Sequence, residues 1–149
     1  MITIALTTET DTAELAGRIA GILAAGDTLL LSGEIGAGKS AFARALIRAR
    51  LGRMEDVPSP TFTLVQTYDD PQGDIWHCDL YRLTHPDEVF ELGLDAAFAT
   101  AICLIEWPDR LGTDAPANAL RMAFSAGAAA HSVTIDGPPA WLDRLKGLL

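Results

Sequence analysis

The stretch Gly33-Glu34-Ile35-Gly36-Ala37-Gly38-Lys39-Ser40 is the strongest structural signal in this 149-residue chain. Its glycines, lysine and serine have the spacing of a phosphate-binding loop. The apolar run 29–31 before it is typical of a strand, and the residues after it are typical of a helix. Glycines let backbone N–H groups turn toward phosphate oxygens, and the next helix adds the positive end of its dipole. This context predicts a nucleotide site on an α/β fold.

Two side chains of the loop are expected to add to its backbone contacts. Lys39 supplies a mobile charge for the β- and γ-phosphates, and the Ser40 hydroxyl is placed to bind Mg²⁺. The only other lysine in the sequence is Lys146, so an Asn-Lys-x-Asp motif for guanine is impossible. The loop residues expected to contact the nucleotide through the backbone are Gly33, Glu34, Gly36, Ala37 and Gly38.

The composition predicts one acidic globular domain over residues 1–149. Hydrophobic residues make up 49% of the chain, which is enough for a core. The net charge of −9 repels a phosphate backbone, so we expect no DNA or RNA binding by this surface alone. Contact with RNA would have to go through a basic partner.

The cysteines and the N-terminus indicate a cytoplasmic protein. Cys78 and Cys103 lie in apolar or strand-like stretches without the paired spacing of a zinc site, so we expect free thiols in a reducing compartment. No apolar run reaches the roughly 18 residues of a membrane span, and no secretory signal is recognisable. We therefore expect a soluble protein with no membrane partner.

The order of elements predicts a P-loop NTPase-like domain with helices flanking a mixed sheet. Strands are expected at residues 1–6, 28–32, 61–68, 74–81, 101–105, 120–124 and 132–135. Helices are expected from Thr8–Thr12 through Leu23 to Gly26-Asp27, from the loop to Gly52, from His85-Pro86-Asp87-Glu88 to Gly93, and over Trp141 to Leu149. The short turn 69–73 predicts an antiparallel pair, so the sheet is both parallel and antiparallel.

The segment Ser59-Pro60-Thr61-Phe62 lies between the helix after the loop and the predicted hairpin. In phosphate-loop proteins, a loop threonine here closes over the γ-phosphate and Mg²⁺ and releases after hydrolysis. The alternative is that Pro60 only shapes the entry into a strand. Both interpretations stay open from the sequence.

His77, Asp79 and Tyr81 alternate, so an extended strand presents all three on one face. Asp79 could bind the Mg²⁺ hydration shell or orient the attacking water. A single histidine such as His77 is more typical of a hydrogen-bonded structural position.

Glu106 ends a buried apolar strand, where open α/β sheets place the polar residues of a ligand crevice. A carboxylate at this position would bind Mg²⁺ directly or through water. Trp107 follows it, and either stacks on the nucleotide base or packs against its neighbours.

Taken together, these motifs resemble those of the TsaE family, a group of small bacterial ATPases needed to make threonylcarbamoyladenosine in tRNA. The resemblance covers roughly residues 4–110. It rests on the phosphate loop, on Ser59-Pro60-Thr61-Phe62, on His77-Cys78-Asp79-Leu80-Tyr81-Arg82 and on Ile105-Glu106-Trp107-Pro108. These four features, in this order in so short a chain, are more specific than a phosphate loop alone.

The resemblance implies binding of ATP with Mg²⁺ and a weak ATPase activity that depends on TsaB and TsaD partner proteins. It assigns phosphate and metal roles to Lys39 and Ser40, and a switch and metal role to Thr61. It makes Asp79 the essential strand carboxylate and Glu106 a Mg²⁺ ligand. In that system a TsaD-type protein transfers the carbamoyl group, so this chain would supply nucleotide-driven turnover, and tRNA would be met only through partners.

The chain departs from the family pattern in three places. Ala41 replaces a frequent hydroxyl residue, so only its backbone N–H remains for the nucleotide. Glu34 replaces a more usual aspartate, and the match fades beyond Arg110, where His131 is a weak candidate for an expected basic residue. A phosphotransferase is disfavoured because no arginine-rich lid follows the loop, whereas a nucleotide sensor that does not hydrolyse ATP stays open.

Overall fold

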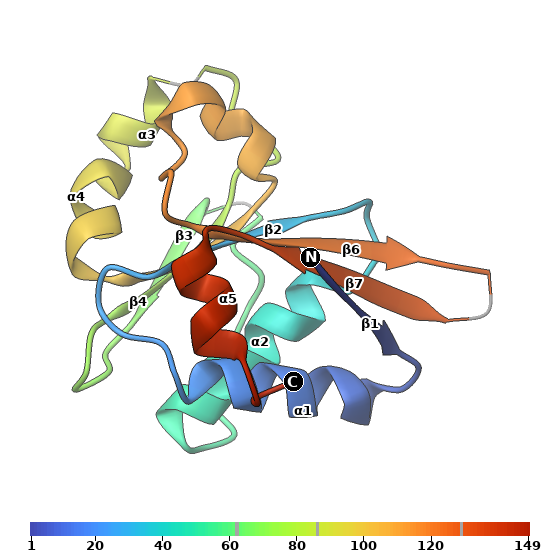
Figure 1. Ribbon diagram of the computed structural model, residues 1–149. Helices are drawn as coiled ribbons and strands as arrows, with labels where there is room; N and C mark the ends of the chain where they lie inside the picture. The colour runs from blue at the N-terminus through green and yellow to red at the C-terminus, as the bar shows by residue number, and fades with distance from the viewer. Residues whose placement is uncertain (62, 86, 129) are drawn as a thin grey trace.

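A computed structural model describes residues 1–61, 63–85, 87–128 and 130–149 (Figure 1). Phe62 and Pro86, which belong to predicted features, lie outside the described residues.

The central strands of the sheet are strongly apolar runs of the chain. β2 (Thr28–Ser32) and β5 (Ile102–Glu106) pair in parallel, and every residue of β5 is buried. Helices cover both sides of these strands, which therefore need no polar face.

The strands of the described residues form one sheet in the order β1-β7-β6-β2-β5-β4-β3. The other strands are β1 (Ile2–Leu6), β3 (Val65–Tyr68), β4 (Ile75–Asp79), β6 (Leu120–Ala126) and β7 (His131–Asp136). β2 pairs in parallel with β5 and β6, and β4 with β5, whereas β3–β4, β6–β7 and β1–β7 are antiparallel. The predicted mixed sheet is confirmed, and so is its antiparallel hairpin.

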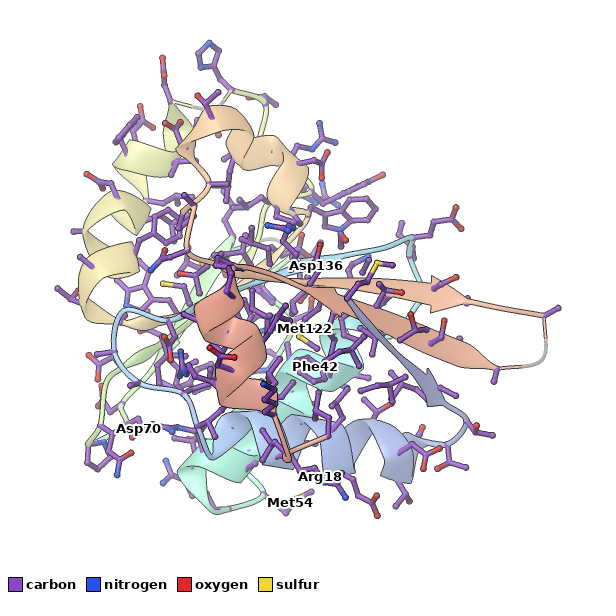
Figure 2. The ribbon with its side chains drawn as sticks, in the orientation of Figure 1. Arg18, Phe42, Met54, Asp70, Met122 and Asp136 are labelled. Carbon is purple, nitrogen blue, oxygen red and sulfur yellow. The ribbon has the colours of Figure 1, made fainter. Side chains whose placement is uncertain are left out.

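Helices cover both faces of the sheet. α1 (Glu9–Ala20), α2 (Lys39–Leu51) and α5 (Pro139–Leu145) share one hydrophobic cluster, and α3 (Glu88–Glu91), α4 (Leu94–Thr100) and the 3-10 helix η1 (Pro108–Asp114) share a second. Figure 1 shows α1 and α2 below the sheet and α3 and α4 above it. Leu29 and Leu31 enter the first cluster and Leu30 the second, because a strand alternates its faces. Figure 2 shows Phe42 and Met122 in the interior, within the first cluster.

The first helix begins as predicted but ends earlier. A capping box at Thr8 starts α1. The helix ends at Ala20 rather than at Gly26-Asp27, so the prediction that Leu23 lies on its face is wrong. Arg50 of α2 donates hydrogen bonds to the carbonyl oxygens of Ala20 and Leu23, at 2.9 and 3.0 Å. These donors satisfy carbonyl groups that a helix end leaves unpaired, and the chain can turn there.

The strands of the hairpin are shorter than predicted. β3 begins at Val65 rather than at residue 61, because Leu64 has a left-handed backbone with φ of 67° that no extended strand accommodates. β4 ends at Asp79 rather than at residue 81. The N–H of Tyr81 donates to the Asp79 carboxylate at 3.0 Å, which turns the chain out of the sheet.

The helical segments after β4 and at the C-terminus also differ from the prediction. The helix predicted to end at Gly93 corresponds to the short α3, and Gly93 turns the chain with φ of 81°. The sequence pattern does not predict α4, which begins directly after this glycine. The pattern also misses η1, since Pro108 at its start gives only a signal for the end of a strand. α5 stops at Leu145 rather than Leu149, because Gly147 turns the chain with φ of 73°.

Candidate nucleotide-binding site

The phosphate loop connects β2 to α2, and its glycines take backbone conformations that other residues rarely adopt. Gly33, Gly36 and Gly38 have φ values of 133°, 84° and 111°. A Cβ atom on Gly33 would lie 2.4 Å from the backbone oxygen of Phe124, so a side chain is excluded there. Gly38 caps α2 without a side-chain hydrogen bond, and the first turn of α2 carries no acidic residue. The N–H groups at this helix end are therefore suited to an anion.

Lys39 lies buried beneath the loop, with 5% of its surface exposed. Its ammonium group donates to the carbonyl oxygens of Gly33 and Glu34, the latter at 3.1 Å. The Nζ atom also lies 4.2 Å from the centre of the Trp107 ring, which is a cation–π contact. These contacts hold the charge at the start of α2.

Burial and two nearby carboxylates have opposite effects on the pKa of the Lys39 ammonium group. Burial lowers the pKa of the Lys39 ammonium, and the negative charges of Glu106 and Asp79 oppose that shift. Each of these carboxylates is itself buried, with exposures of 1% and 6%. Buried charges are retained where opposite charges and hydrogen bonds compensate the loss of water, as these do.

Glu106 joins the phosphate loop to β4 through both of its carboxylate oxygens. The Ser40 hydroxyl donates to Oε1 at 2.8 Å, and Nε2 of His77 lies 2.7 Å from Oε2. His77 is 2% exposed. The structure thus brings the predicted metal ligands Ser40 and Glu106 into direct contact, and it adds His77, which the sequence pattern alone gave as structural.

Asp79 contacts the third predicted metal ligand, Thr61. The Thr61 hydroxyl donates to the Asp79 carboxylate at 3.2 Å and shares a 2.8 Å hydrogen bond with the Ser59 hydroxyl. Asp79 and Glu106 lie opposite each other in the parallel pair of β4 and β5. Hydroxyl and carboxylate oxygens are ligands that Mg²⁺ prefers, so this set fits a magnesium ion beside bound phosphates.

The predicted alternation along β4 holds for two of its three residues. His77 and Asp79 are buried on one face, whereas Cys78 enters the hydrophobic cluster on the other. Tyr81 lies past the strand end and is 43% exposed. Its ring packs against Trp107 with a centroid distance of 4.9 Å. Trp107 has a left-handed backbone with φ of 58°, and its contacts place it near Lys39.

Most of the predicted site residues surround one hollow with a volume of about 1080 Å³. Those that line it are Glu34, Gly36, Gly38, Lys39, Ser40, Ala41, Thr61, Asp79, Glu106 and Trp107. Gly33 and Ala37 do not line it, because Gly33 abuts Phe124 and Ala37 is buried in the first hydrophobic cluster. Their predicted contacts with the nucleotide are therefore limited to backbone groups and stay predictions.

The hollow also includes residues that the sequence pattern missed. It extends past α2 to the first turn of α1, and the missed lining residues include Thr8, Glu9, Thr12, Arg44 and Arg48. His131, which the sequence gave as a weak candidate for a basic residue, lines it as well. The threonines before α1 gave a signal only for a helix cap, and nothing in the spacing linked them to the phosphate loop. His131 reaches the hollow because β7 pairs with β1, where it lies opposite Leu6.

Both cysteines lie in the interior of the protein. Cys78 and Cys103 are free and buried, and burial raises the pKa of the Cys103 thiol to about 12. The described ranges contain no group of three or more His, Cys, Asp or Glu residues that could hold a metal ion by itself. Within the same ranges, no helix has the length and apolar character needed to span a membrane.

Comparison with known proteins gives a consistent family match. The family described as "Threonylcarbamoyl adenosine biosynthesis protein TsaE" matches residues 6–133. The tRNA threonylcarbamoyladenosine biosynthesis protein TsaE of Rickettsia bellii is 42% identical over 104 residues, which cover 70% of this chain and 72% of the relative. The protein of the same name from Rickettsia felis is also 42% identical over 104 residues, covering 70% of this chain and 61% of that longer relative.

A solved structure shares the whole fold. The structure titled "Crystal structure of Bacillus subtilus YdiB" superposes with a TM-score of 0.78, covering 99% of this chain and 93% of that one. The sequence identity of the pair is 23%, so this likeness concerns the fold. The predicted α/β fold with a mixed, helix-flanked sheet is confirmed by both the coordinates and this neighbour.

Proposed function

Because this chain belongs to the TsaE family, we propose that it is a Mg²⁺-dependent ATP-binding protein with a weak, partner-stimulated ATPase activity. Its role lies in the biosynthesis of tRNA threonylcarbamoyladenosine. We propose ATP and Mg²⁺ as its ligands and TsaB and TsaD as the partners that it needs. We also propose that it acts in the cytoplasm.

One observation carries the proposal of a metal–nucleotide site. The Ser40 hydroxyl donates to Glu106 at 2.8 Å, directly after a glycine loop that ends at the uncapped start of α2. A hydroxyl at a helix start and a strand-end carboxylate are the pair that holds Mg²⁺ against phosphates in phosphate-loop enzymes. Ser40, Thr61 and Glu106 would hold the ion, which when bound would neutralise charge on the phosphate oxygens.

The space around the loop supports a ligand larger than phosphate. The hollow continues from the loop along Ala41 of α2 to the first turn of α1. We propose that the phosphates occupy the loop end, with Lys39 turning from the loop carbonyls toward them. The ribose and base would then occupy the remaining space.

The proposed dependence on partners comes from the family and fits the shape of the site. Thr61 contacts Asp79 through a single hydrogen bond of 3.2 Å, and it precedes a turn that lies outside the sheet. We propose that this segment closes over a nucleotide only part of the time, so that hydrolysis is slow until a partner stabilises the closed form. TsaB and TsaD are the proposed partners, and the net charge of −9 favours contact with tRNA through them.

The proposed function is tested by ATP hydrolysis with and without the host's TsaB and TsaD proteins. We expect a low rate for the chain alone and a clear increase with both partners. Nucleotide binding without hydrolysis under both conditions would instead identify a sensor. Absence of any MgATP binding would contradict the proposal as a whole.

A further inference from the structure

Hydrogen bonds connect three side chains, from Ser40 at the phosphate loop through Glu106 to His77 in the middle of β4. Ser40 donates to Oε1 of Glu106 at 2.8 Å, and Oε2 of the same carboxylate lies 2.7 Å from Nε2 of His77. The side chains of His77 and Glu106 are each only 2% exposed. The contact between His77 and Glu106 is therefore shielded from water, and it helps to fix the orientation of the carboxylate.

The other ring nitrogen of His77, Nδ1, accepts or donates no hydrogen bond within the part of the chain that the structure describes. Nδ1 is buried, and no hydrogen-bonding group among the described residues reaches it. A buried polar atom without a partner costs free energy, which an apolar residue in the same place would avoid. On the sheet, His77 lies between the apolar Leu104 of β5 and Gln66 of β3, and the Gln66 amide donates to the Thr63 hydroxyl at 3.1 Å. Among the described residues, the contact with Glu106 is the side-chain hydrogen bond that offsets the burial of this imidazole.

We propose that His77 is a positioning residue for the metal–nucleotide site. Its Nε2–H donates to Oε2 of Glu106 and so keeps Oε1 directed at Ser40 and at a divalent ion bound there. A carboxylate only accepts hydrogen bonds, which places the imidazole proton on Nε2. This inference rests on the proposed Mg²⁺–nucleotide function, and it assigns no contact between His77 and the nucleotide itself.

The proposal distinguishes two amide substitutions of His77. The amide nitrogen of glutamine lies about as far along the side chain as Nε2, so His77→Gln retains a donor to Glu106. The amide nitrogen of asparagine corresponds to Nδ1, so His77→Asn loses the donor while keeping a polar group. A residue that orients a metal ligand typically contributes tenfold or more to metal affinity.

The test measures Mn²⁺ binding to the ADP-loaded protein by electron paramagnetic resonance, a readout that needs no hydrolysis. His77→Asn should weaken Mn²⁺ binding about tenfold or more, approaching the loss in Glu106→Gln, and His77→Gln should stay within about threefold of the parent. Thermal melts of each variant separate folding from binding. Equal Mn²⁺ affinity in the parent and His77→Asn would overturn the proposal, even if the melting temperature fell.

The experiment also covers a parent protein that binds no metal and a variant that does not fold. A parent protein that binds no Mn²⁺ with ADP would contradict the proposed function first, and this inference with it. If His77→Asn does not fold, ¹⁵N NMR of the histidine-labelled parent decides. A proton on Nε2 supports the positioning role, whereas a proton on Nδ1 alone overturns it.

Discussion

Asp79 and Glu106 lie opposite each other at the ends of the parallel strands β4 and β5, and both carboxylates are buried. They have separate hydroxyl donors, since Thr61 donates to Asp79 and Ser40 donates to Glu106. Lys39 lies close enough for both negative charges to favour its protonated form. The candidate site therefore contains two differently held carboxylates around one cation, and substitutions of its members should have distinct effects.

Lys39→Ala should weaken MgATP binding at least tenfold, because it removes the full positive charge at the loop. Loss of a charge-assisted phosphate contact costs about 2 kcal/mol or more. Calorimetric titration measures it, with Lys146→Ala as the control, since the Lys146 side chain is 84% exposed. An unchanged dissociation constant in Lys39→Ala would contradict the proposal that this loop binds the phosphates of ATP.

Asp79→Asn and Glu106→Gln should each reduce hydrolysis far more than MgATP affinity measured with Mg²⁺ in excess. A carboxylate that holds the metal or orients water acts mainly on charge that develops in the transition state. Their effects should not add if they serve one metal site. The exposed Glu91 provides a control as Glu91→Gln. If either variant, assayed with both partners, hydrolysed ATP at the parental rate, the substituted carboxylate would have no catalytic role.

Thr61→Ala should abolish most partner-stimulated hydrolysis while keeping most of the nucleotide affinity. The variant loses the hydroxyl that contacts Asp79 but leaves the phosphate loop intact. Rates of the chain alone and with TsaB and TsaD measure the effect. The exposed Thr63 is a matched control as Thr63→Ala. If the partners stimulated ATP hydrolysis equally in the parent and in Thr61→Ala, Thr61 would have no switch role.

Asp70→Asn should destabilise the fold by about 3 to 5 kcal/mol, the usual result of breaking a buried ion pair. Arg50 and Asp70 form such a pair at 2.8 Å, with side-chain exposures of 8% and 5%. The exposed pair of Asp143 and Lys146 is the control, and Asp143→Asn should cost less than about 1 kcal/mol. Urea unfolding measures both, and equal effects would contradict this prediction.

The same pair predicts a dependence of stability on pH. Burial alone would raise the pKa of the Asp70 carboxyl, but the N–H of Gln72 and the guanidinium of Arg50 hold it below its ordinary value. The unfolded chain therefore takes up a proton at a higher pH than the folded chain. The stabilisation is complete above about pH 4 and is lost as the pH falls through the folded value. Asp70→Asn should flatten this acid limb of the stability curve.

Local signals predicted most of the sheet and the phosphate loop. The run before Gly33 forms the parallel strand β2, and the residues after Gly38 form the helix α2. Both could be predicted because the pattern that indicates them lies within a few residues of the chain. The contact of His77 with Glu106 depends on the register of β4 against β5, which no local pattern encodes. The early end of α1 likewise depends on Arg50, which lies far along the chain.

If the loop at Ser40 and the carboxylate of Glu106 hold a metal–nucleotide complex, a crystal structure grown with Mg²⁺ and a non-hydrolysable ATP analogue should show it. We expect phosphates against the backbone of residues 33–40, Lys39 turned toward them, and Mg²⁺ in contact with the Ser40 hydroxyl. A nucleotide bound elsewhere, with Lys39 still on the carbonyl oxygens of Gly33 and Glu34, would contradict it.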